Sequence, residues 1–211
     1  MLTTTFRLLR KALRKARACS DCYKHLAKAM GGVRRYGPDT PISLVKVLEV
    51  NGLYDALWCL RAVPEEQEKE RDRLSRLLAC DYAEGKDGRV LAIYEKKFPD
   101  DKRPRTCIEV SRRYAEGQAT DEELASARTA AWAAGWDAWD TWAAWDTTVT
   151  ALGAEAVAGA TLAADAALAT VATVGCATMA AATVETADAA AVAVRGTERE
   201  WQAERFRERL G

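Results

Sequence analysis

A dense group of charged side chains in this chain lies around a turn enclosed by Pro99 and Pro104. Its members, continued on the helix expected after the turn, are Asp100, Asp101, Lys102, Arg103, Arg105, Arg112 and Arg113. Free backbone N–H groups at a helix start favour anions, and a guanidinium binds carboxylate or phosphate through two parallel hydrogen bonds. These residues therefore predict a site for an anion or a partner. The alternative is that the aspartates cap the helix and the arginines pair with acids such as Glu95 or Glu109.

A second candidate is a series of tryptophans in the C-terminal half. Within fourteen residues stand Trp132, Trp136, Trp139, Trp142 and Trp145. At about 100° per residue the first three share one face of a helix, and the last two lie progressively off it. We expect these rings to fill a core between alanine-rich helices. The other interpretation is an aromatic platform for a partner or a stacked ligand, with Trp58, Trp136 and Trp139 as candidates.

Metal and catalytic motifs are sparse. Cys19, Cys22 and His25 have metal-like spacing, but on one helix they spread around the circumference, and a second ligand pair is missing. As the only histidine, His25 has no partner for general-base work. The sequence contains no phosphate-binding glycine loop, no serine–histidine–aspartate arrangement and no HExxH motif. We expect buried thiols, no metal, no cofactor and no enzymatic activity.

Charge is unevenly distributed although the formal net charge is zero. Residues 1–40 carry ten Lys/Arg against two Asp, whereas residues 119–194 carry ten acids and only Arg128. Arg7, Arg10, Arg14 and Arg17 recur at helical spacing near the N-terminus. We interpret them as a solvated face that compensates the acidic half, within one chain or between subunits, and we do not expect nucleic-acid binding.

The elements that must position these residues are all expected to be helices. We expect a multi-helix bundle over residues 1–118, followed by long Ala/Trp-rich antiparallel helices over 119–211. The first part is predicted to contain helices at 5–30, 42–50, 53–63, 64–84, 90–98 and 104–116. Thr120 and Glu123 form a capping box at the start of the second part. A single helix from 120 to 210 would be about 135 Å long, so we expect turns at Gly153, Gly159, Gly175 or Gly196.

One uncharged stretch, residues 166–184, is long enough to cross a bilayer. It is rich in Ala and Thr, and Asp165 and Glu185 flank it without Lys, Arg or aromatic anchors. We expect a buried helix here and no membrane association. The N-terminus is basic without the apolar segment of a signal peptide, and the six cysteines are scattered. A reduced cytoplasmic protein is the prediction.

Several segments, taken in order, resemble a known family. They are NGLYDALWCLRAV at 51–63, residues 73–81 and 90–95, DDKRPR at 100–105, TDEEL at 120–124 and, less strictly, WQAER at 201–205. Together they resemble the Imm-five-like immunity proteins of bacteria and their phages. The resemblance implies an all-helical protein associated with toxin systems, without an established reaction. Residues 147–194 depart from the family's tail, in which Arg, Asp and Trp are interspersed regularly among the alanines.

The leading functional hypothesis is a non-enzymatic immunity or counter-defence protein that sequesters a toxin or effector protein. Such a protein should present a broad exposed patch. The first alternative is a phage-encoded protein that sequesters a small anionic signal such as a cyclic nucleotide, with Arg103, Arg105 and Arg112 on the phosphates and tryptophan on the base. It requires a concave basic pocket with unpaired arginines. The second alternative is a structural helical protein, and a homo-oligomer is expected.

Overall fold

A computed structural model describes residues 1–140 and 188–211, and for residues 139–140 and 188–195 it describes the backbone alone. The described residues form helices joined by short turns, together with one pair of two-residue strands. The all-α prediction is confirmed. The expected turns at Gly153, Gly159 and Gly175 and the uncharged stretch 166–184 lie outside the described residues.

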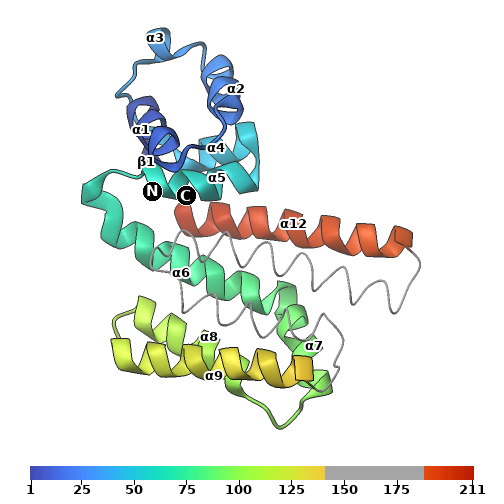
Figure 1. The fold of residues 1–211 in the computed structure, drawn as a ribbon. Coiled ribbons are helices and arrows are strands. Elements are labelled where there is room, and N and C mark those ends of the chain that lie inside the picture. The colour runs from blue at the N-terminus through green and yellow to red at the C-terminus, as the bar shows by residue number, and fades with distance from the viewer. Residues whose placement is uncertain (141–187) are drawn as a thin grey trace.

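The N-terminal helices form one end of the molecule, shown in blue in Figure 1. β1 (Thr3–Thr4) pairs antiparallel with β2 (Ile42–Ser43), a short ladder that the sequence did not suggest. The helices of this part are α1 (Phe6–Ala16), α2 (Asp21–Ala29), α3 (Val33–Tyr36), α4 (Leu44–Asn51) and α5 (Leu53–Cys59). Gly52 separates α4 from α5 with a φ of 86°, a left-handed conformation that glycine adopts without the steric cost of a Cβ.

The single helix predicted over residues 5–30 is wrong, because the structure divides it into α1 and α2. α1 ends at Arg17, whose φ of 50° lies in the left-handed region. The Arg17 N–H donates to the carbonyl oxygens of Arg14 and Leu13, which closes the last turn. Neither glycine nor proline marks this point in the sequence. The apolar spacing of Phe6, Leu9 and Leu13 therefore does not predict that the helix ends at this point.

The central helix is α6 (Glu68–Glu84), which lies between the helix of residues 188–210 on one side and the helices of residues 103–115 and 121–140 on the other (Figure 1). Its apolar residues Leu74, Leu77, Leu78 and Tyr82 are all buried. Short 3-10 turns precede and follow it, η1 (Leu60–Ala62), η2 (Glu65–Gln67) and η3 (Lys86–Gly88). The remaining helices are α7 (Arg89–Lys97), α8 (Arg103–Ala115), α9 (Asp121–Asp140) and α12 (Asp188–Leu210).

The start of the alanine-rich part follows the sequence prediction. The Glu123 N–H donates to Thr120 Oγ1 (3.2 Å), and the Thr120 N–H donates to Glu123 Oε2 (2.8 Å), which completes the capping box of α9. Gly196, in contrast, does not turn the chain, because it lies inside α12. One glycine costs a helix only about 1 kcal/mol, and the burial of Phe206 and Leu210 on the same helix outweighs that cost.

One apolar core joins the two parts of the chain. It extends from Leu2 and Phe6 near the N-terminus to Phe206 and Leu210 near the C-terminus, and it includes Leu124 of α9. α9 packs along α8, and α12 packs on α6, α4 and α5. The described parts of 119–211 therefore pack on the helices of 1–118.

Candidate functional site

Arg103, the first arginine of the predicted anion site, is held between two carboxylates. It donates to Asp101 through Nε (2.9 Å to Oδ1) and Nη2 (2.6 Å to Oδ2), and to Asp137 Oδ2 of α9 (2.6 Å). Tyr94 O–H donates to the same Asp101 carboxylate (2.6 Å). Burial raises the pKa of Asp101, but the hydrogen bonds from Arg103 and Tyr94 outweigh it and bring that pKa to about 2. Arg103 thus fixes the turn against α9.

The other charged residues of the turn are distributed over separate pairs. Arg105 donates through Nε and Nη2 to the two oxygens of Glu95 (both 2.6 Å), as the capping-and-pairing alternative predicted. Arg113 pairs with Glu123 (3.0 Å). Lys102 and Asp100 are exposed. The residues that the sequence placed in one site therefore do not converge on a common point.

Arg112 belongs to a cluster around Asp81 of α6, whose side chain is 5% exposed. It donates to Asp81 Oδ1 (3.1 Å) and to both oxygens of Glu84 (2.6 and 2.8 Å). Arg209 of α12 donates to the same Asp81 carboxylate (3.0 and 3.2 Å), and Arg205 Nε lies 3.7 Å from it. This network joins α6, α8 and α12, so the role that the structure gives to Arg112 is to hold helices together.

Because Arg103, Arg105 and Arg112 are paired with acids, the turn does not present the anion site that the nucleotide alternative requires. A phosphate would have to displace Asp101, Glu95 and Glu84 before it could bind the three arginines. The cavities described below are not lined by Arg103, Arg105 or Arg112. The prediction of a basic pocket at this position is therefore wrong. The pairing of Arg112 could not be predicted from neighbouring residues, because the acids that neutralise it lie 28 and 31 residues earlier in the chain.

Trp132 and Trp136 lie on the outer face of α9, not in the core. Trp132 is 47% exposed and Trp136 is 51% exposed. Their rings form a T-shaped pair with centroids 5.7 Å apart. The buried face of the helix is made of alanines instead, Ala131, Ala134 and Ala138. The core interpretation is thus wrong for these two rings; the side chain of Trp139, together with Trp142 and Trp145, lies outside the described residues.

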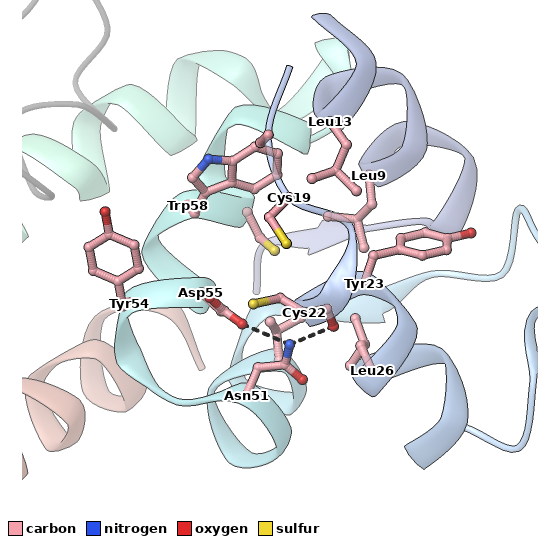
Figure 2. Close-up of a pocket in the computed structure, with 13 residues that line it drawn as sticks. Leu9, Leu13, Cys19, Cys22, Tyr23, Leu26, Asn51, Tyr54, Asp55 and Trp58 are labelled. Atoms are coloured by element: carbon pink, nitrogen blue, oxygen red, sulfur yellow. Dashed lines mark hydrogen bonds between the residues drawn. The ribbon is translucent and has the colours of Figure 1, made fainter. Parts of the chain in front are cut away.

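A partly open cavity is formed by α1, α2, α4 and α5 and is lined by Trp58, another of the predicted aromatic candidates (Figure 2). Its volume is about 230 Å³. Most of its wall is apolar, and the described residues that line it are Leu9, Leu13, Ala18, Cys19, Cys22, Tyr23, Leu26, Val47, Asn51, Tyr54, Asp55, Trp58 and Cys59. Arg61 lies over the Trp58 ring, 5.7 Å from its centroid.

A small polar group lies on the wall where α2 meets α4 and α5. Asn51 Nδ2 donates to the Cys22 carbonyl oxygen and to Asp55 Oδ2, each at 2.8 Å (Figure 2). The Cys22 thiol also hydrogen-bonds to Asp55, and this bond together with burial raises the pKa of Cys22 to about 11. Burial likewise raises the pKa of Cys59. Both thiols are therefore protonated and unreactive at neutral pH.

Sequence reasoning found Trp58 but missed Asn51 and Asp55. The two residues Asn51 and Gly52 directly follow the helix predicted at 42–50, and the structure ends α4 there. The additional signal was the spacing of Asn51, Asp55 and Trp58, which places them on one side of two consecutive helices. Whether the side with Asn51, Asp55 and Trp58 faces the cavity depends on the angle between α4 and α5 at Gly52. Apolar periodicity does not predict such an angle.

A second, shallower cavity of about 460 Å³ lies on the other side of α1. It is lined by Phe6, Arg7, Arg10, Lys11, Arg14, Tyr23, Val33 and Pro38, and none of these described residues is acidic. Arg7 forms an ion pair with Asp39. In the described part of the chain Arg10, Lys11 and Arg14 form no ion pair, so this groove, not the proline-enclosed turn, is the concave basic surface.

Metal and membrane features were searched within residues 1–140 and 188–211. These residues contain no group of three or more His, Cys, Asp or Glu side chains that could hold a metal ion. In the same ranges no helix is sufficiently long and apolar to cross a membrane.

Comparisons with known proteins give no match: no family model, no curated protein and no solved structure matches the chain. The relation to the Imm-five-like immunity proteins therefore stays a resemblance of sequence segments. The structural features on which a functional proposal can rest are the exposed tryptophan pair of α9, the partly open cavity beside Trp58 and the basic groove on α1.

Proposed function

We propose that this chain is a non-enzymatic binding protein that neutralises a partner protein by covering it. The docking surface is the outer face of α9, and the observation that carries the proposal is the half-exposed pair Trp132 and Trp136. The resemblance to immunity proteins supplies the class of partner, which is a toxin or effector protein.

The tryptophan pair is held in a fixed orientation by the opposite side of its helix. Ala134 and Ala138 pack with Tyr94 and Phe98, and Arg103 of the turn binds Asp137 on the same helix. Rotating α9 to bury the indoles would expose these alanines and break the ion pair. The exposed rings are therefore preorganised, which lowers the entropy cost of binding a partner.

The surface around the rings has the composition of an interaction site for a protein. Along the same side of α9 stand the small residues Ala125 and Thr129, and Arg128 lies one turn before Trp132. An indole has a large apolar surface and an N–H at its edge, and tryptophan is among the residues that most often dominate protein interfaces. A partner with an apolar depression for the two rings would bury most of the area that α9 now exposes to water.

The test uses tagged full-length protein and extracts of phage-challenged bacteria, with captured proteins quantified by mass spectrometry. The Trp132→Ala/Trp136→Ala variant removes both rings, and Tyr54→Ala is the matched control because Tyr54 is also exposed but lies on α5. One hot-spot tryptophan contributes about 2 kcal/mol, roughly thirtyfold in Kd. We expect a protein recovered with the wild type and with Tyr54→Ala, and reduced at least tenfold with the double variant. Capture that does not depend on the two tryptophans contradicts the proposal.

The sequestration of a small anion is the second candidate, and the basic groove on α1 favours it. Arg10, Lys11 and Arg14 line this groove beside the partly exposed ring of Tyr23, so a ligand with a phosphate and a flat base would meet both charge and an aromatic surface. Native mass spectrometry of the protein from infected cells should then show a retained anionic mass. Arg10→Ala/Arg14→Ala should lose it, whereas Lys15→Ala, on the same helix outside the groove, should keep it. An empty wild-type protein contradicts this second candidate.

A further inference from the structure

We propose that the partly open cavity between α1, α2, α4 and α5 binds a small primary amine whose apolar body is about the size of one or two fused aromatic rings. This site is separate from the α9 face and does not depend on it. The proposal is based on the size of the cavity, on the sign of its only charge and on the hydrogen-bonding groups of its polar wall.

The volume of the cavity sets the size of the occupant. At about 230 Å³ it exceeds the roughly 150 Å³ of an apolar protein cavity that holds benzene, and it is below the roughly 300 Å³ at which sites for drug-sized ligands begin. Leu9 and Leu13 enter from α1, and Trp58 and Tyr23 contribute aromatic surface (Figure 2). An aromatic ring with a short side chain matches both the volume and this apolar lining.

The charge of the cavity selects a cation. Among the described residues that line it, Asp55 is the only one that is charged at neutral pH, because the Cys22 thiol, with a pKa of about 11, stays protonated. A carboxylate in a mostly apolar wall attracts a cation more strongly than it would in water and repels an anion. The same cavity is therefore unsuitable for the nucleotide considered for the α1 groove.

The hydrogen-bonding groups of the polar wall select an ammonium donor. Asn51 Nδ2 is used by the Cys22 carbonyl oxygen and by Asp55 Oδ2. Asp55 accepts from Asn51 Nδ2 and from the Cys22 thiol, and a carboxylate has about four lone-pair sites. Asp55 therefore keeps acceptor capacity, and an ammonium group, with three donors and no acceptor, complements it.

The test measures binding of three probes of similar shape to the full-length chain at pH 7 by ligand-observed NMR and calorimetry. The probes are phenethylamine, propylbenzene, in which a methyl group replaces the ammonium, and phenylacetate, in which the charge is reversed. We expect phenethylamine to bind at least tenfold more tightly than propylbenzene, and phenylacetate not to bind. Two results with the wild-type protein overturn the proposal without any variant. One is that phenethylamine does not bind at millimolar concentration, and the other is that phenethylamine and propylbenzene bind equally tightly.

Three variants then locate the site. Asp55→Asn should weaken phenethylamine binding at least tenfold and leave propylbenzene unchanged. Leu13→Trp should fill the cavity and abolish both. Asp39→Asn is the matched control, because it removes the same charge from an exposed residue that pairs with Arg7 outside the cavity. Thermal unfolding checks that each variant is folded. Equal amine affinity in Asp55→Asn and wild type, with both folded, overturns the assignment of Asp55.

Discussion

Glu198 is a carboxylate that the fold holds in an environment favouring its neutral form. The residue is 6% exposed, and both of its oxygens lie 3.4 Å from the Lys86 N–H at the turn after α6. Burial raises the pKa of Glu198 above its ordinary value of 4.5, and the hydrogen bond from Lys86 only partly opposes this. The folded state therefore binds the proton more tightly than the unfolded state. Its stabilising contribution is complete below pH 4.5 and is lost as pH rises through the folded pKa.

Replacing Glu198 with glutamine should consequently stabilise the protein at neutral pH. The amide oxygen keeps an acceptor for Lys86, and the cost of burying a charge disappears. Thermal unfolding at pH 7 should show a higher Tm for Glu198→Gln than for wild type, and the difference should vanish at pH 4. Glu200→Gln, on the exposed side of the same helix, should leave Tm unchanged at both pH values. A lower Tm for Glu198→Gln at pH 7 would show that the carboxylate is stabilising.

The sequence predicted single residues well where their partners are near in the chain. The Arg105–Glu95 pair, ten residues apart, and the Thr120–Glu123 capping box were both predicted. Arg112 was misjudged because its second partner, Asp81, is shared with Arg209 from a helix at the other end of the chain. No local pattern contains that information, since the three residues meet only after α6, α8 and α12 have packed.

At the scale of elements, the break between α1 and α2 depends on an arginine in a conformation that glycine prefers. Arg17 has a φ of 50° and its N–H closes the end of α1. We expect Arg17→Gly to stabilise the protein by about 1 kcal/mol, because the left-handed conformation is penalised for residues with a Cβ. Arg14→Gly, three residues earlier inside the helix, should instead destabilise it by about 1 kcal/mol. Urea unfolding of both variants gives the comparison, and a loss of stability in Arg17→Gly would contradict the argument.

The attachment of α12 depends on Asp81. Two arginines, Arg112 from α8 and Arg209 from α12, donate to this buried carboxylate. We expect Asp81→Ala to cost about 3 kcal/mol or more, because it leaves partly buried guanidinium groups without their partner. Glu208→Gln is the control, since its pair with Arg205 is at the surface and should contribute less than about 1 kcal/mol. Hydrogen exchange should show loss of protection in α12 first, and unchanged protection there would contradict this role.

The sequence predicted the order and limits of the helices between residues 42 and 116 better than those of the first forty residues. Residues 104–116 and 90–98 correspond to α8 and α7 within one residue at each end. The misjudged features were the break at Arg17 and the position of Gly196 inside α12. Both are cases in which tertiary packing overrides a local preference, because glycine is tolerated in a packed helix and arginine is forced into a left-handed turn.

At the scale of the whole molecule, positive and negative charges are concentrated in different segments of the chain. Residues 1–40 are basic, and residues 119–194 carry ten acids. If the two are complementary between copies, the protein is a homo-oligomer held partly by electrostatic attraction. Light scattering after size exclusion should then give a multiple of 23.1 kDa in low salt and a smaller mass in 1 M salt. A monomer mass in both conditions would contradict the expected oligomer.

Both ends of the chain meet at α4, and this has a consequence for synthesis on the ribosome. The Leu44 N–H donates to the Leu2 carbonyl oxygen (3.1 Å), while α12 packs on α4 and buries Phe206 and Leu210 in the same core (Figure 1). Roughly 130 residues separate the end of α5 from the start of α12, which corresponds to on the order of ten seconds of translation. During that interval the nascent N-terminal helices expose the apolar surface that α12 will cover, and a chaperone has its longest opportunity to bind there.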